Sequence, residues 1–298
     1  VHLDVIRMVF TPLIITLGLV LISVITIFVL AKKTVKCRKI VSIILSVICF
    51  ASLVVTIVFI SKYFAKHING DGYFTDPSSG FNSTMLYVLA GVLAVILVVG
   101  ALVIGRKDKK PFNTKCLAMA GICVALSFAL SYIKIVDMPT GGSITLISLL
   151  PIMTFSYIYG VKKGVLVSFL YGVLQAIQDP WLIHPAQFLL DYPLAFGMAG
   201  FAGILTSLNV GGNNKLKFAL GALLGGVLRY VCSTLSGVFA FGAYAIEAGT
   251  TNFLAYSLVY NLAIIIDAIL VAIAGVIIFT SKSFLKEVEK LNPDLINK

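Results

Sequence analysis

The sequence predicts an all-α membrane protein that crosses the bilayer many times, and three observations lead to this prediction. Of the 298 residues, 59% are hydrophobic and only 12% are charged, compared with roughly 25% charged residues in an average soluble domain. The mean hydropathy is +1.05, and a water-soluble globule cannot bury that much apolar surface. The apolar residues form long runs separated by short basic clusters, which is how orientation is encoded in a bilayer.

The apolar runs define the expected helices, because a membrane span needs about 20 mostly apolar residues. The first run is followed by lysines rather than by a small-residue cleavage site, so it is not a signal peptide. The chain begins at Val1 rather than at a methionine, which leaves its natural start open. In order along the chain, we expect nine spans at about 9–31, 40–62, 86–105, 115–135, 144–160, 164–178, 186–206, 218–240 and 253–280.

The basic clusters predict how the spans are oriented. With nine spans, the clusters at 32–39, 106–110, 162–163, 215–217 and 282–290 all fall on one side, and the opposite loops are nearly neutral. The positive-inside rule then places the N-terminus outside and the C-terminal tail in the cytoplasm of a cell-membrane protein. The formal charge of +11 fits contact with anionic lipid. No aromatic-interleaved basic face is present, so nucleic acid is not an expected partner.

A change in the residue composition of the spans predicts two domains. Residues 1–105 carry plain Val/Ile/Leu spans and form a three-span N-terminal appendage. Residues 106–112 (RKDKKPF) are a basic cytoplasmic junction. Glycine, proline, tyrosine and isolated carboxylates enter the spans after it, so we expect residues 113–298 to form a six-span functional module.

The motifs that are missing from the sequence limit the chemistry. The five cysteines form no C-x-x-C pair and the three histidines lie far apart, so we expect no metal site and no cofactor. No G-x-x-x-x-G-K-[ST] phosphate loop is present, so the chain cannot hydrolyse ATP itself. An intramembrane enzyme is disfavoured, because the sequence has no G-x-S-x-G elbow, no His/Cys nucleophile pair and no paired carboxylates.

Three charged residues lie inside predicted spans: Asp191, Arg229 and Asp267. A charge in a span costs about 3 kcal/mol by insertion scales, so it usually faces a cavity or a partner. Arg229 and Asp267 could form a structural pair between two helices. For Asp191 we favour a binding role, because Trp181, the only tryptophan, and Tyr192 lie near it in the sequence. These aromatic residues are either interfacial anchors or the walls of a pocket for a flat cation.

A second polar and aromatic region lies on the same predicted side of the membrane, in the last two spans. It could be helix packing, but two such regions on one face favour a binding site. Its glycine permits close approach of a backbone or ligand, and its asparagine can read the edge of a heterocycle. The residues are Ser233, Ser236, Gly237, Phe239, Phe241, Tyr244, Tyr256, Tyr260 and Asn261.

Four long, ordered segments carry a specific resemblance to a known family. They are Gly141–Ile152 (GGSITLISLLPI), Gln187–Gly203 (QFLLDYPLAFGMAGFAG), Arg229–Gly237 (RYVCSTLSG) and Tyr256–Asn261 (YSLVYN). Through them, residues 113–298 resemble the substrate-binding S-components of energy-coupling factor vitamin transporters, in the thiamine branch. The resemblance implies a six-helix S-component bundle, here preceded by three extra transmembrane helices, with a vitamin pocket near the outer face.

The resemblance also implies which residues bind the ligand. Asp191 and Tyr192 match a carboxylate–tyrosine pair, with Asp in place of the usual Glu, and Trp181 matches an aromatic residue ten positions earlier. Gly237, Tyr256 and Asn261 match a glycine, a tyrosine and an asparagine. Three positions depart from the pattern: Ser233 replaces a histidine, Phe241 replaces a tryptophan, and residues 134–142 carry no tryptophan.

The resemblance further implies partners. Ala125 and Ala129 look like the alanine motif by which S-components dock their transmembrane coupling subunit, and two ATPase subunits would supply the energy. We therefore expect uptake of a small-molecule vitamin, with thiamine as the transported ligand and membrane lipid around the module. A thiamine precursor or another small heterocycle, and a non-transporting vitamin sensor or scaffold, remain alternatives.

Overall fold

The computed structural model describes residues 11–29, ten positions between 41 and 59, and the ranges 77–107, 112–137, 143–178, 181–208, 210 and 212–295. The chain divides into two compact units, Val1–Thr75 and Asp76–Lys298. Each unit is described by itself.

The first unit contains helix α2, Thr11–Val29, where the sequence predicts a span at 9–31. Its hydroxyl groups are satisfied by the helix itself: Thr16 donates to the carbonyl of Pro12 at 3.0 Å, and Ser23 donates to that of Leu19 at 2.7 Å. Thr16 also shares a 2.7 Å hydrogen bond with the hydroxyl of Ser52. Most of the span expected at 40–62 lies outside the described residues.

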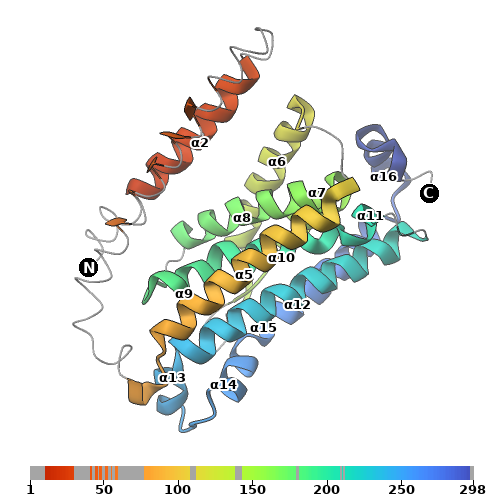
Figure 1. Cartoon of the computed structure of the whole chain (residues 1–298). Helices are drawn as coiled ribbons and strands as arrows, with labels where there is room; N and C mark the ends of the chain where they lie inside the picture. Colours follow the sequence, from red (N-terminus) through yellow and green to blue (C-terminus); the bar gives the residue numbers. More distant parts are fainter. Residues whose placement is uncertain are drawn as a thin grey trace. The chain divides into compact units, whose positions relative to one another are not determined.

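The second unit is a bundle of helices with one short hairpin (Figure 1). Its elements are η3 (Pro77–Ser79), α5 (Ser83–Ile104), η4 (Gly105–Lys107), α6 (Thr114–Ser131), β1 (Lys134–Asp137), β2 (Ser143–Thr145), α7 (Leu150–Tyr159), α8 (Val161–Gln178), α9 (Pro185–Leu189), the π-helical turn η5 (Leu190–Leu194), α10 (Ala195–Ala199), η6 (Gly200–Gly203), α11 (Ile204–Ser207), α12 (Asn214–Ala240), α13 (Gly242–Glu247), α14 (Phe253–Tyr260), α15 (Leu262–Ile278), α16 (Lys282–Leu291) and η7 (Pro293–Leu295).

Helix starts in this unit are set by polar N-cap residues, whose side chains accept a hydrogen bond from a free backbone N–H of the first turn. Asn82 caps α5, Asn113 caps α6, Asn213 caps α12, Asn252 caps α14 and Ser281 caps α16. These caps fix the ends of apolar segments whose composition alone does not define a boundary.

Five helical segments of the described part are long and apolar enough to cross a membrane: Ser83–Ile104, Thr114–Ser131, Pro185–Ser207, Asn214–Ala240 and Phe253–Ile278. They correspond to the spans predicted at 86–105, 115–135, 186–206, 218–240 and 253–280. The multi-pass helical prediction is therefore confirmed at these five places.

The span predicted at 144–160 is not confirmed as one continuous helix. Residues Ser143–Thr145 instead form β2, which pairs antiparallel with β1. Helix α7 begins only at Leu150, with Pro151 at its start, and ends after ten residues at Gly160, whose φ of +88° breaks the helix. Ten residues rise only about 15 Å, about half of the hydrocarbon core. The all-α prediction is thus corrected by a small hairpin.

The predicted boundary at residue 105 also differs from the structure. Helix α5, assigned by the sequence to the N-terminal appendage, packs on α8, α9 and α12. Leu86, Leu93 and Leu97 of α5 are buried. The boundary between the compact units falls between Thr75 and Asp76. The sequence did not indicate this boundary, because the leucine stripe of α5 could not be distinguished from a lipid-facing surface.

The core of the second unit is built from aromatic residues and close helix contacts. Tyr157, Phe218 and Phe279 pack edge-to-face or tilted at 4.9–5.6 Å between ring centroids. Helices α12 and α15 run side by side along this core. A Cβ at Gly221 of α12 would lie 2.1 Å from the carbonyl oxygen of Ala202, so only glycine permits this approach.

Candidate ligand-binding site

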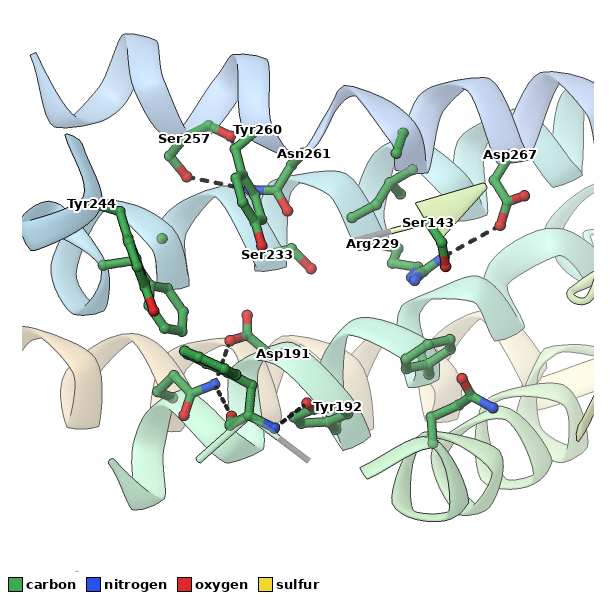
Figure 2. A pocket seen from close by; sticks show the side chains of 18 of the residues that line it. Ser143, Asp191, Tyr192, Arg229, Ser233, Tyr244, Ser257, Tyr260, Asn261 and Asp267 are labelled. Atoms are coloured by element: carbon green, nitrogen blue, oxygen red, sulfur yellow. Dashed lines mark hydrogen bonds and ion pairs between the residues drawn. The ribbon is translucent and has the colours of Figure 1, made fainter. Parts of the chain in front are cut away.

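One cavity of about 490 Å³ lies between the π-turn segment and helices α12, α14 and α15 (Figure 2). All eight residues that the sequence predicts to bind a ligand line it: Trp181, Asp191, Tyr192, Ser233, Gly237, Phe241, Tyr256 and Asn261. The remaining lining residues are Ser143, Gln175, Gln187, Phe196, Arg229, Tyr244, Ser257, Tyr260, Ala263, Ile264 and Asp267. The structure therefore brings the predicted residues together, and their contact with a ligand stays a prediction.

Asp191 is held in place by a buried glutamine one helical turn earlier. The Nε2 of Gln187 donates to Asp191 Oδ2 at 2.6 Å and to the carbonyl of Trp181 at 3.0 Å. The same side chain accepts a 3.2 Å hydrogen bond from the backbone N–H of Ile183 through Oε1. Gln187 thus ties the carboxylate to the loop that carries Trp181.

The segment that carries Asp191 and Tyr192 is a π-helical turn, Leu190–Leu194. Pro193 lies inside it and has no N–H to donate, which an α-helix does not accommodate without distortion. The backbone N–H of Ala195 bonds the carbonyl of Leu190, five residues back, and so continues the helix past the proline. Local sequence chemistry therefore produces a widened turn at the point where two predicted ligand residues face the cavity.

Tyr192 supports the loop above it. Its hydroxyl accepts a 2.8 Å hydrogen bond from the backbone N–H of Trp181. Trp181 itself is 53% exposed, and its ring centroid lies 6.3 Å from that of Tyr244. Tyr244 in turn lies 6.3 Å from Phe241. Aromatic faces therefore line this end of the cavity, near the Asp191 carboxylate.

The opposite wall is formed by α12 and α14. A Cβ added to Gly237 would lie 2.2 Å from Ser257 Oγ, so the two helices meet closely only because this position is glycine. Asn261 donates from Nδ2 to the carbonyl of Ser257 at 2.9 Å, which fixes the orientation of its amide. Ser233 and Tyr260 lie beside Asn261 in Figure 2. This wall offers hydrogen-bonding groups across from Asp191.

The far end of the cavity carries the other two charges noted in the sequence. Arg229 Nη1 of α12 lies 4.0 Å from Asp267 Oδ2 of α15, which confirms the pair between two helices. The guanidinium also stacks on Phe196, with its Cζ 4.2 Å from the ring centroid. Both charged side chains line the cavity.

The charged residues of the lining define which ligands the cavity suits. Asp191, Arg229 and Asp267 are the charged members of this lining. Arg229 and Asp267 pair with each other, which leaves the carboxyl group of Asp191 beside the aromatic faces without a basic partner in this lining. Such an arrangement attracts a flat cation through charge pairing and cation–π contact.

The proposed docking residues lie elsewhere. Ala125 and Ala129 are exposed on α6, on one face with the exposed Ile122 and Leu126. Helix α6 packs on α7 and α8 with its other face. The docking role of the two alanines stays a prediction, and both side chains are exposed among the described residues.

Sequence reasoning missed several lining residues. Gln175 was visible as an amide inside an apolar span, which is the one signal that could have found it. Ser143 and Phe196 carried no local signal in the sequence. Ser143 reaches the cavity because the hairpin places it there. Phe196 reaches it through its contact with Arg229. Gln187 was noted beside Asp191 without a role, because its bonds depend on the folded loop.

Comparison with known proteins supports a single family. The family described as Thiamine transporter protein (Thia_YuaJ) matches residues 117–287. Thiamine transporter ThiT of Bacillus subtilis (strain 168) is 37% identical over 133 residues, which is 42% of this chain and 68% of that protein. ThiT of Lacticaseibacillus paracasei is 29% identical over 153 residues, 47% of this chain and 74% of that protein. A solved structure of ThiT from Listeria monocytogenes shares 27% identity with a TM-score of 0.48 and covers 59% of this chain and 96% of that one.

The family match and the Bacillus subtilis relative confirm the resemblance drawn from the four sequence segments. The family match extends over more than half of the chain, and the Bacillus subtilis relative exceeds 30% identity across two thirds of its own length. The matched region contains every residue of the cavity lining. This chain therefore belongs to the thiamine transporter protein family.

Proposed function

We propose that this chain is the membrane-embedded, thiamine-binding subunit of a vitamin uptake system. One observation carries the proposal: in a chain of this family, a cavity of about 490 Å³ presents one uncompensated carboxylate, Asp191, beside Trp181, Tyr192 and Phe241. Thiamine is a permanent cation with two flat rings, so charge pairing and aromatic stacking both suit it.

Each predicted residue has a task in this proposal. Asp191 pairs with the charge or amino group of the ligand, and the aromatic side chains of Trp181, Tyr192, Phe241 and Tyr256 stack on its rings. Asn261 reads the edge of a ring with its amide. Gly237 and Ser233 leave room along α12. Thiamine is the transported ligand rather than a cofactor.

The energy for uptake comes from partners in this proposal. The sequence has no phosphate-binding loop of the Walker type, so two ATPase subunits would act through a transmembrane coupling subunit. The exposed Ala125 and Ala129 on α6 form the docking face for that coupling subunit. Small residues allow close helix–helix contact in a membrane, which supports this assignment.

The topology belongs to the same proposal. The chain crosses the cell membrane with its N-terminus outside and its C-terminus in the cytoplasm, and the aromatic end of the cavity opens outward. The distribution of the basic clusters supports this orientation. The opposite positions of the two termini require an odd number of crossings, and nine stays the proposed number, with α7 as the shortest helical segment among them.

The departures at Ser233 and Phe241 favour a second candidate, in which the same site binds a thiamine precursor or another small heterocycle. A non-transporting vitamin sensor differs in a further way, since it would bind its ligand with no dependence on coupling subunits. Uptake that requires those subunits would separate transport from sensing.

The test is thiamine binding to the purified full-length protein in detergent, followed by quenching of Trp181, the only tryptophan. We expect saturable quenching by thiamine, and about 10- to 100-fold weaker binding in Asp191→Asn, which removes a charge and keeps the shape. Hydroxymethylpyrimidine, a neutral thiamine precursor, is titrated in the same way for comparison with thiamine. Quenching by the precursor but not by thiamine would reassign the substrate, and no response to any vitamin would overturn the proposal.

A further inference from the structure

The cavity has two ends of different chemistry (Figure 2). The aromatic end consists of Asp191 with Tyr192 and Tyr244, and the ring of Trp181 lies beside that of Tyr244. The ion-pair end consists of Arg229 and Asp267, with Ser143 beside them. A single cationic ring needs only the first end, so the second end requires its own explanation.

The ion pair at the second end is incompletely satisfied. Its closest contact is 4.0 Å, which is longer than a charge-assisted hydrogen bond. Asp267 receives a 3.4 Å contact from Thr145 Oγ1 on the same oxygen, Oδ2. Among the described residues, Arg229 Nε and Asp267 Oδ1 have no hydrogen-bond partner although both atoms are buried.

Buried polar atoms without partners are rare and expensive, particularly inside a membrane. Arg229 offers donors and Asp267 offers acceptors, and both side chains face the same cavity. A neutral hydroxyl can accept from the guanidinium and donate to the carboxylate at the same time. A phosphate gains from Arg229 but is repelled by Asp267, and it cannot donate when it is fully ionised.

We propose that the Arg229–Asp267 pair is a specificity-determining subsite that binds a neutral hydrogen-bonding group of the ligand and excludes phosphorylated forms. The inference rests on the proposed function, in which thiamine occupies the cavity. Thiamine ends in a hydroxyethyl group, and thiamine monophosphate differs from it by an anionic phosphate on that group. Asp267 is the discriminating residue, because it cancels the charge that would otherwise attract the phosphate.

The first experiment uses the wild-type chain in detergent and follows Trp181 fluorescence with three probes: thiamine, thiamine monophosphate and O-acetylthiamine. The acetyl ester lengthens the same end of the molecule without adding a charge. We expect the monophosphate to bind at least about ten-fold more weakly than the acetyl ester, as like charges require. Equal weakening by both groups would mean steric exclusion and would overturn the inference.

The second experiment compares two variants with opposite effects on charge. Asp267→Asn should reduce the ratio of the monophosphate Kd to the thiamine Kd by about ten-fold or more, because Arg229 is no longer neutralised. Arg229→Gln should increase the same ratio, because Asp267 is left alone. A purely structural pair would lower the thermal midpoint in both variants and leave the ratio unchanged.

The outcomes separate this inference from the function on which it rests. If thiamine does not quench the wild type, the proposed function fails. If thiamine binds but the three-probe comparison shows no charge effect, only the role of Asp267 fails. The wild-type comparison decides the question even if a variant does not fold.

Discussion

At the scale of single residues, Gln187 is the side chain on which the aromatic end of the cavity depends. It is 1% exposed and joins Asp191 to the backbone of Trp181 and Ile183. The helical spacing of four residues brings it beside the carboxylate, and the loop then closes over it. No pattern in the sequence indicates the loop contacts, which is why the role of Gln187 could not be predicted.

We expect Gln187→Leu to weaken thiamine binding by about 10- to 100-fold, since hydrogen bonds to charged groups contribute about 1.5–3 kcal/mol. The measurement is a titration of Trp181 fluorescence. Tyr157→Phe is the control, because its hydroxyl bonds Asn214 at 3.0 Å outside the cavity. An unchanged Kd in Gln187→Leu would show that Asp191 holds its position without this contact.

His184 is a second residue with a testable role. Its Nδ1 accepts a 3.2 Å hydrogen bond from the backbone N–H of Ala186 and so caps α9, and its Nε2 shares a 2.9 Å hydrogen bond with Ser83 Oγ of α5. Burial lowers the pKa of His184 below its ordinary value of 6.5. Because Nδ1 acts as an acceptor, the capping arrangement needs the neutral ring.

Because the pKa of His184 is lower in the folded chain, the unfolded chain binds more protons than the folded chain when the pH falls below 6.5. The free energy of unfolding therefore decreases with acidification. We expect the thermal midpoint to fall more between about pH 7 and pH 5 in the wild type than in His184→Asn, because asparagine caps a helix without titrating in this range. Parallel pH profiles of the two proteins would contradict the role of the cap.

Residues that carry charge or aromatic faces inside apolar spans were predictable at this scale. Asp191, Tyr256 and Asn261 stand out against their surroundings, and the structure places all three on one cavity. Arg229 and Asp267 were identified as intramembrane charges, but their position at the cavity could not be derived. The sequence offered the pair itself, but its place at the cavity depends on the register of α12 against α15, which no sequence spacing encodes.

At the scale of elements, the contact between α12 and α14 depends on one glycine. Gly237→Ala would place a Cβ 2.2 Å from Ser257 Oγ and would push the helix that carries Tyr256 and Asn261 away from the cavity. We expect at least about ten-fold weaker thiamine binding together with a lower thermal midpoint, in the range typical of overpacking.

The matched control for this substitution is Gly91→Ala on α5, where an added Cβ meets no atom within 4 Å. That variant should bind thiamine normally and should be slightly more stable, because alanine is the better helix former. Equal losses in both variants would point to a general effect on helices rather than to the close contact at Gly237.

The long apolar helices were predictable because composition and length decide whether a segment spans a membrane. The hairpin and α7 were not, since the run 144–160 is apolar throughout and its division depends on pairing with β1. The π-turn was likewise invisible, although Pro193 within a span marked the place of an irregularity.

At the scale of the whole molecule, the folded unit that contains the cavity begins near residue 77 rather than at 113. Gly80, which has a φ of +76°, packs against the ring of Phe253. The backbone N–H of Asn82 donates a 3.0 Å hydrogen bond to the carbonyl of Phe239. Leu97 lies against Gly197. The helix added before the family-matched region is therefore packed into the bundle.

We expect a chain that starts at residue 77 to keep its thermal midpoint and its thiamine affinity. A chain that starts at residue 106 should melt on the order of 10 °C lower, because it loses the buried leucines of α5. Thermal unfolding with and without thiamine measures both quantities. If the two shortened chains behave alike, α5 is dispensable and the boundary lies where the sequence predicted it.

The class of the protein was predictable from composition, and the family from four segments, because both are properties of long stretches. The domain boundary was not predictable, because a leucine stripe that faces helices and one that faces lipid look the same in a membrane. Only the contacts of Leu86, Leu93 and Leu97 separate the two cases.

The placement of α5 has a consequence for how such a chain could be acquired during evolution. Helix α5 packs on α8, α9 and α12, whereas α6 packs on α7 and α8 and keeps Ala125 and Ala129 exposed. A helix added against α8, α9 and α12 leaves the exposed face of α6 with Ala125 and Ala129 unchanged. Under the proposed docking at Ala125 and Ala129, a lineage that gains α5 therefore needs no compensating mutations in the gene of its coupling subunit.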